Sequence, residues 1–159
     1  MNVLFVHENT LGHGSYLPVF VEYFSRHPEL EINCELLNAA PLPDELARKA
    51  DHTIRGLRRF GLDMRFARWR KVVSAHVRAL VDARDLKKYD AIVVNTQSIA
   101  LDLADVARPL FVCLDATLRQ LSESKWFSDP PLGAVATKLN SRLIKAERAL
   151  FGAAKKVLP

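Results

Sequence analysis

The sequence predicts an α/β domain, a Rossmann-like open parallel sheet with helices on both faces. Short, unbroken apolar runs, typical of strands covered on both sides, alternate along the chain with helical segments. A length of 159 residues suits a single domain spanning 1–159. Hydrophobic residues make up 49% and charged residues 26%, values that exclude disordered and fibrous classes. No apolar run approaches the roughly 18–20 residues of a membrane-spanning helix, and no secretory signal is recognisable.

The first half of the predicted sheet comes from two strands with a helix between them. Asn2–His7 is a continuous apolar run and predicts the first strand. A turn follows, and then a helix over Pro18–Arg26 with Ser15 as its N-cap. Leu30–Leu37 predicts the second strand.

A long helical region follows the second strand. Asp44 is placed to cap a short helix over Glu45–Ala50, and Thr53–Leu86 has helical periodicity broken near Gly56 and Gly61. In its second half apolar residues recur at steps of three and four, which predicts one buried face. These residues are Phe66, Trp69, Val73, Val77, Leu80 and Val81.

The remaining elements complete a five-stranded sheet. Ala91–Asn95 predicts the third strand, Ser98–Val106 a short helix, Leu110–Leu114 the fourth strand and Lys156–Leu158 the fifth. Between the last two strands lies an amphipathic helix closed by Gly152. Its apolar face comprises Val135, Leu139, Leu143, Ala146 and Leu150.

Polar residues follow three of the predicted strands directly. In open parallel sheets ligands bind at the carboxyl ends of the strands, so these residues predict a cleft for a polar, hydroxyl-rich or phosphorylated ligand. The alternative is that strand ends are simply where polar loops begin. The residues are His7, Glu8 and Asn9, then Asn95, Thr96 and Gln97, then Asp115, Ala116 and Thr117.

Two local features carry candidate chemistry. Gly12 and Gly14 flank His13 before the first helix, where backbone N–H groups can hold a phosphate or simply form a tight turn. The dinucleotide pattern G-x-G-x-x-G is not met, because Leu17 stands at the third glycine position. Asp115, just past a buried strand, is either a general acid or base or the N-cap of a following helix.

The sequence predicts neither a metal site nor a disulfide. His7 and His13 lack Cys, Asp or Glu at the spacing of a metal centre. Cys34 and Cys113 lie within strand-like runs and are expected to be buried free thiols, which suits a reducing cytoplasm.

Positive charge is concentrated in the middle of the chain. The net charge is +5, and the segment 48–88 holds 13 Lys or Arg against 4 Asp. This segment is either a solvated helix face, a surface for anionic lipid or phosphate, or a nucleic-acid site. Aromatic residues spaced for base stacking are lacking, so nucleic acid is the least favoured partner. The membrane prediction rests on Arg65–Leu86 and gives a cytoplasmic protein, peripheral on the inner face of the membrane.

The order of elements resembles the N-terminal domain of retaining glycosyltransferases of family 4, which have the two-domain GT-B fold. NVLFVHENTLGHGSY resembles the first strand and glycine loop of that domain, and AIVVNTQSIAL a strand whose polar residues face the cleft. PLFVCLDATLRQL resembles the variant with a D-x-T stretch, and KKVLP the strand that leads into the linker. The similarity covers nearly the whole chain through loose motifs, and the histidine that many relatives carry after the fourth strand is missing.

The resemblance implies that this chain is one half of an enzyme. A second domain, absent from these 159 residues, would hold the nucleotide-sugar donor, and this half alone would fold without catalysing transfer. Gly12, His13 and Gly14 would lie near the donor diphosphate, and Asp115 near the hydroxyl of a small-molecule, glycan or lipid acceptor. Asn95, Gln97 and Thr117 would surround that hydroxyl, and neither a metal nor another cofactor would be needed. A non-catalytic α/β binding or regulatory module with a basic docking face is the alternative.

Overall fold

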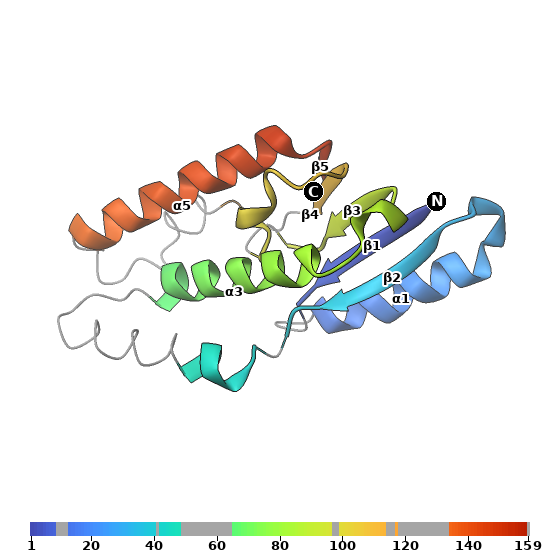
Figure 1. The fold of residues 1–159 in the computed structure, drawn as a ribbon, viewed down its shortest axis with the longest axis horizontal. Coiled ribbons are helices and arrows are strands. Elements are labelled where there is room, and N and C mark those ends of the chain that lie inside the picture. Colours follow the sequence, from blue (N-terminus) through green and yellow to red (C-terminus); the bar gives the residue numbers. More distant parts are fainter. Residues whose placement is uncertain are drawn as a thin grey trace.

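A computed structural model places five strands in one parallel sheet, in the order β2-β1-β3-β4-β5 (Figure 1). It describes residues 1–8, 13–40, 42–48, 65–96, 99–113, 117 and 134–158. The strands are β1 (Asn2–His7), β2 (Asn33–Asn38), β3 (Ala91–Val94), β4 (Leu110–Cys113) and β5 (Lys156–Leu158). All four neighbouring pairs are parallel, which confirms the predicted Rossmann-like α/β class.

Three long helices of the described residues pack against the sheet, and they divide unequally between its faces. They are α1 (His13–Arg26), α3 (Arg65–Asp82) and α5 (Ala134–Ala153). Figure 1 shows α1 behind the sheet, with α3 and α5 together on the other side and projecting past the carboxyl ends of the strands. We call the side of α3 and α5 the closed face and the side of α1 the open face.

The closed face contains the main hydrophobic core. Leu4, Val6, Ile92 and Val94 alternate with their open-face neighbours along β1 and β3, and none of the four is exposed to solvent. They pack with the described part of the apolar stripe predicted for the long helix, Val73, Val77, Leu80 and Val81 of α3, whereas the side chains of Phe66 and Trp69 lie outside the described residues. Further members from β4 and α5 are Leu110, Val112 and Leu150.

The open face is less completely covered in the described part of the chain. Phe5 of β1 packs against Phe20 of α1 with ring centroids 5.7 Å apart. However, Phe20 is 43% exposed, Val19 63% and Tyr23 51%. On the same face Val93 and Phe111 are only half-buried.

Several predicted boundaries are corrected. The second strand begins at Asn33 and not at Leu30, because Pro28–Leu30 forms a 3-10 turn and Glu31 has a left-handed backbone (φ 52°). In residues 99–106 of the predicted helix Ser98–Val106 the structure has 3-10 conformation at Ile99 and a 3-10 turn over Leu101–Leu103, and no α-helix.

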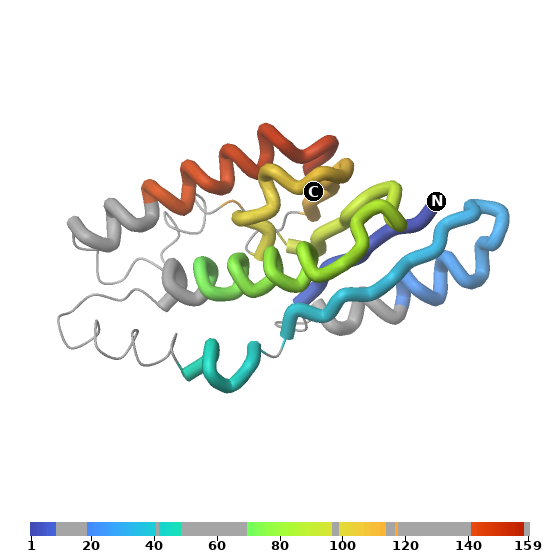
Figure 2. Tube along the Cα trace, in the orientation of Figure 1, coloured from blue at the N-terminus to red at the C-terminus, as the bar shows by residue number. Residues whose placement is uncertain are grey.

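Helix ends also differ from the predictions. Helix α1 begins at His13, five residues before the predicted start, and α3 ends at Asp82 and not at Leu86. A short helix over residues 44–48 follows β2 (teal in Figure 2), in agreement with the predicted helix after Asp44. The predicted strand ends at Asn95 and Leu114 fall just past β3 and β4, which stop at Val94 and Cys113.

Candidate functional site at the carboxyl edge of the sheet

The strand order defines where a ligand is expected to bind. From β1 the chain crosses to β2 on one side through α1, whereas β3 lies on the other side of β1. The connections therefore diverge between β1 and β3, and in doubly wound sheets the crevice at this switch point, outside the carboxyl ends of the strands, holds the ligand.

Both strand ladders continue one residue past their ends at this point. The Asn95 amide donates to the Val6 carbonyl (3.1 Å), and the Ala39 amide donates to the His7 carbonyl (2.8 Å). The backbone of the switch point is thus held in register up to its edge, which fixes the direction of the side chains there.

The last register row on the open face is polar. His7 pairs with Asn38, and continuation of the β1–β3 and β3–β4 registers sets Asn95 beside His7 and Cys113 beside Asn95. The preceding row on the same face is apolar and consists of Leu36, Phe5, Val93 and Phe111. The edge therefore changes from apolar to hydrogen-bonding groups within one pleat. We call Asn38, His7 and Asn95 the neutral row.

His7 is the buried member of the neutral row. Its side chain is 6% exposed, and its Nδ1 atom is buried without a hydrogen-bond partner among the described residues. Burial lowers the pKa of His7 below its ordinary value of 6.5, so the imidazole is neutral at pH 7. A buried polar atom left unsatisfied costs about 1–3 kcal/mol.

Charged residues occupy the same edge on the closed face. Glu8 follows β1 and points to the side of Leu4 and Val6, because side chains alternate along a strand. Arg70 of α3 is 7% exposed and Glu147 of α5 is 3% exposed. Burial lowers the pKa of Arg70 to about 10, while the nearby carboxylates of Glu147 and Glu8 oppose that shift. We call Glu8, Arg70 and Glu147 the charged cluster.

The charged cluster and the neutral row differ in the polar groups that a ligand could contact. In the charged cluster the carboxylates of Glu147 and Glu8 act on the Arg70 guanidinium, so its attraction for an external anion is partly offset within the protein. On the neutral row a buried imidazole nitrogen has no partner in the described chain. The open side of the switch point is therefore the better candidate for ligand binding.

The predicted site residues fall into three groups. Asn95 lies in the neutral row, half-buried, and Thr117 is also half-buried. The backbone of His13 and Gly14 forms the first turn of α1, whose N-terminus lies at this edge because the helix follows β1. Gly12, Gln97 and Asp115 lie outside the described residues.

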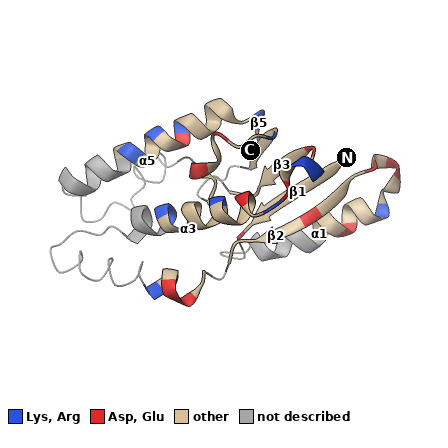
Figure 3. Ribbon diagram, in the orientation of Figure 1, with Lys and Arg blue, Asp and Glu red and all other residues tan. Residues whose placement is uncertain are grey.

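Arginines of the basic segment are turned toward acidic groups of the protein itself. Arg70 belongs to the charged cluster, and the Arg84 Nε lies 3.3 Å from a Glu35 carboxylate oxygen. Glu35 also accepts a hydrogen bond from the hydroxyl of buried Tyr89. In the described part of α3, residues 70–82, Figure 3 shows separate basic positions.

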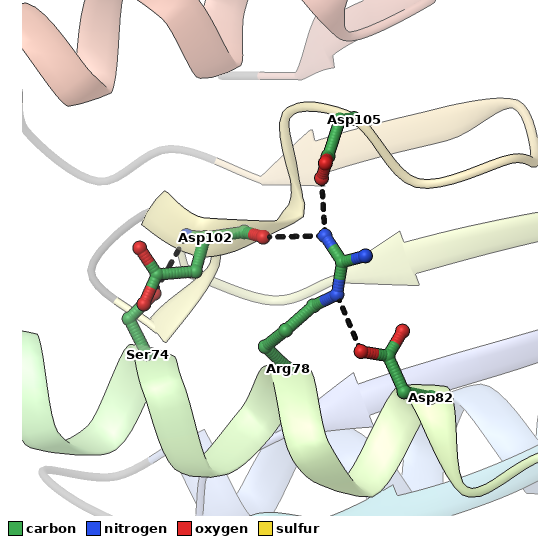
Figure 4. Close-up of polar contacts among 5 residues, drawn as sticks. All are labelled: Ser74, Arg78, Asp82, Asp102 and Asp105. Atoms are coloured by element: carbon green, nitrogen blue, oxygen red, sulfur yellow. Dashed lines mark hydrogen bonds and ion pairs between the residues drawn. The ribbon is translucent and has the colours of Figure 1, made fainter.

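Arg78 provides the clearest example (Figure 4). Its Nε donates to Asp82 (2.8 Å), and its Nη1 donates to the Asp102 carbonyl (3.0 Å) and to Asp105. The Asp102 amide in turn donates to the buried Ser74 hydroxyl (2.7 Å). These contacts fasten the segment around Leu101–Leu103 to α3, so Arg78 has a structural role and contributes little to a docking surface.

These features define a doubly wound α/β protein with a polar switch point. Comparison with protein-family models, curated proteins and solved structures finds no match to this chain. Among the residues that the structure describes, no three His, Cys, Asp or Glu side chains are grouped to hold a metal ion. Within the same residues no helix combines the length and apolarity needed to cross a bilayer. Cys34 and Cys113 form no disulfide among the described residues, and both are half-buried where the sequence predicted buried thiols.

Proposed function

We propose that this chain is the acceptor-side domain of a glycosyltransferase that moves a sugar from a nucleotide-sugar donor to an acceptor hydroxyl. The observation that carries the proposal is the neutral row at the switch point between β1 and β3. An uncharged, hydrogen-bonding edge beside the start of a helix suits a hydroxyl-rich ligand next to a phosphate. The sequence resemblance to the N-terminal half of family 4 enzymes points in the same direction.

Residue roles follow from that proposal. The backbone amides of Gly12, His13 and Gly14, before and within the first turn of α1, would lie near the donor diphosphate, because a helix N-terminus favours negative charge. Asn95, Gln97 and Thr117 would orient the acceptor. Asp115 would accept the proton of the attacking hydroxyl or hold that hydroxyl in place. The nucleotide would be held mainly by a second domain outside these 159 residues.

The alternative, a non-catalytic module with a basic docking face, receives less support. Arg70, Arg78 and Arg84 lie against the protein's own carboxylates and are not available as a uniform positive surface. Lys71 within Arg65–Leu86 is exposed, as are Lys87 and Lys88 directly after it. Binding to an anionic membrane surface through Arg65–Leu86 stays a prediction.

Transfer assays on the full-length gene product test the proposed function. Radiolabelled UDP-, GDP- and ADP-sugars are offered with a mixture of glycan and lipid acceptors, and incorporated label is measured. Asp115→Asn is expected to lower kcat about 100-fold with little change in the KM for the donor, since a positioned base contributes roughly 10²–10⁴-fold.

The matched control is Asp90→Asn. Asp90 lies at the opposite edge of the sheet, where its carboxylate accepts the Asn2 amide (2.7 Å), and this variant is expected to retain wild-type turnover. Absence of transfer from every donor would contradict the proposed function. Unchanged kinetics in Asp115→Asn would remove Asp115 from the chemistry.

A further inference from the structure

We propose that the neutral row, Asn38, His7 and Asn95, is the surface that binds hydroxyl groups of an uncharged acceptor, with the His7 Nδ1 atom as its innermost contact. This inference rests on the proposed function and names the class of acceptor that the site takes, a neutral polyhydroxy compound.

The first support is the combination of burial and missing partner at His7. The side chain is more than nine-tenths buried, and Nδ1 has no hydrogen-bond partner among the described residues. Buried polar atoms in folded proteins are nearly always hydrogen-bonded, and exceptions concentrate where a ligand or reaction needs the group. His7 lies at the switch point, where a ligand would supply the missing partner.

The second support is the register of the row. Asn38 pairs with His7 on β2 and lies on the same face of the sheet. Asn95 directly follows β3, its amide bonds to the Val6 carbonyl, and continuation of the β1–β3 register sets it beside His7. Neighbouring strands are about 4.8 Å apart, so the row extends over roughly 10 Å. A ligand bearing several hydroxyl groups could contact all three side chains at once.

The chemistry of the three groups selects the ligand. A neutral imidazole nitrogen is a donor in one tautomer and an acceptor in the other, and an amide side chain has both functions. The Asn38 oxygen accepts the Ala40 amide (3.0 Å), so Asn38 offers a ligand mainly its amide donors. A hydroxyl group both donates and accepts, so it satisfies either arrangement. A phosphate oxygen without a proton could only accept, and an ammonium group could only donate. No residue of the row carries a charge that would favour either ion.

The charged cluster lies on the other side of the sheet and does not alter this selection. Glu8 follows His7 directly, but its side chain points to the closed face, where Arg70 and Glu147 are buried. The neutral row and the charged cluster therefore act as separate environments at one edge.

NMR titration of the 159-residue chain tests the inference. The probes are methyl α-glucoside, methyl α-mannoside, myo-inositol and, as a separate arm, inorganic phosphate at matched ionic strength. We expect at least one polyol to shift the His7 Nδ1 resonance in a saturable manner and phosphate to leave it unchanged. A saturable response to phosphate alone would overturn the assignment to hydroxyl groups, as would the absence of a saturable shift with every polyol.

Two matched variants on β2 test whether polyol binding depends on the neutral row or on the strand in general. Asn38 and Asn33 are both exposed asparagines, at the carboxyl and amino ends of β2. Asn38→Ala is expected to weaken polyol binding at least threefold, whereas Asn33→Ala leaves the Kd unchanged. Equal effects of the two variants would contradict a role for the row.

His7→Phe distinguishes a ligand contact from a packing residue. Phenylalanine keeps an aromatic ring and removes both nitrogens, so this variant is expected to abolish polyol binding while its Tm stays equal or rises. A lowered Tm with intact binding would identify His7 as a packing residue and overturn the inference. Because these readouts need no sugar transfer, polyol binding without transferase activity of the full-length product would contradict the proposed function alone.

Discussion

The two faces of the sheet differ in how deeply they bury the side chains of the same strands. On the closed face Ile92, Val94 and Val112 are fully buried under α3 and α5, and ionic contacts hold the surrounding segments. On the open face Val93 and Phe111 are half-buried, and α1 exposes Val19, Phe20 and Tyr23. Neighbouring residues of one strand therefore contribute unequally to stability, and the face that contributes less is the one that carries the unsatisfied imidazole of His7.

The difference shows how stability and binding are separated within a small domain. On the closed face the carboxylates of Glu147 and Glu8 lie near the buried Arg70 and offset its charge. On the open face the buried His7 Nδ1 atom has no hydrogen-bond partner among the described residues. Sites that bind ligands commonly give up local stability in this way.

Removal of the buried Arg70 guanidinium is expected to cause the largest decrease in the free energy of unfolding. Arg70→Met leaves the Glu8 and Glu147 carboxylates without their buried counter-charge, which should lower the free energy of unfolding by about 3–5 kcal/mol in urea denaturation. The adjacent exposed Lys71 offers a matched control, since Lys71→Met should change stability by less than about 0.5 kcal/mol. The double variant Arg70→Met, Glu147→Leu should recover part of the loss. Equal costs for Arg70→Met and Lys71→Met would show that the charged cluster is solvated.

The same substitution at two successive positions compares the faces directly. Val94→Ala on the closed face should cost about 2–3 kcal/mol, because the side chain is fully buried and a cavity remains. Val93→Ala on the open face should cost about 1 kcal/mol, because part of that side chain already contacts water. The comparison between faces fails if urea denaturation gives the two variants the same free energy of unfolding.

Loss of the Tyr89 hydrogen bond is expected to lower the free energy of unfolding least, by an amount that depends on pH. Tyr89→Phe removes the hydroxyl that donates to Glu35 on the closed face and should cost about 1 kcal/mol at pH 7. Burial, followed by the bond to Glu35, raises the pKa of Tyr89 from 10 to about 12. Because the folded state holds this proton more tightly, its contribution is complete below pH 10 and disappears as the pH rises toward 12.

Thermal unfolding of both proteins between pH 8 and about pH 12 checks this prediction, with exposed Tyr23→Phe as the control. The difference in Tm between wild type and Tyr89→Phe should become smaller above pH 10. A constant difference would mean that the hydroxyl ionises equally in the folded and unfolded chains.

Most of the fold was predictable, because strand-sized apolar runs and turn residues are local signals. The bounds of Asn2–His7 and Lys156–Leu158 agree with β1 and β5. The start of β2 was not predictable from hydrophobicity, since Leu30 continues the apolar pattern but belongs to a 3-10 turn. In residues 99–106 of the short helix predicted over Ser98–Val106, the structure has only 3-10 conformation, and this segment contacts α3 and α5.

The candidate site was predictable only in part. His7 and Asn95 are recognisable as polar residues after apolar runs, but their alignment with Asn38 depends on strand order and register, which the sequence does not encode locally. The sequence did not mark Arg70 and Glu147 as site residues, because each belongs to an ordinary amphipathic helix. The two residues come close only when α3 and α5 pack on the same face of the sheet.

Strand β2 forms one margin of the sheet, and its sequence has a consequence for how the protein behaves at high concentration. A bare strand margin invites another chain to add to it and to begin an aggregate. Here Glu35 projects from the middle of β2 toward the closed face, held by Tyr89 and Arg84. Any strand that stacked along this margin would have to desolvate that carboxylate and its ion pair. The residues that fasten β2 to the domain thus also discourage its use as a template for self-association.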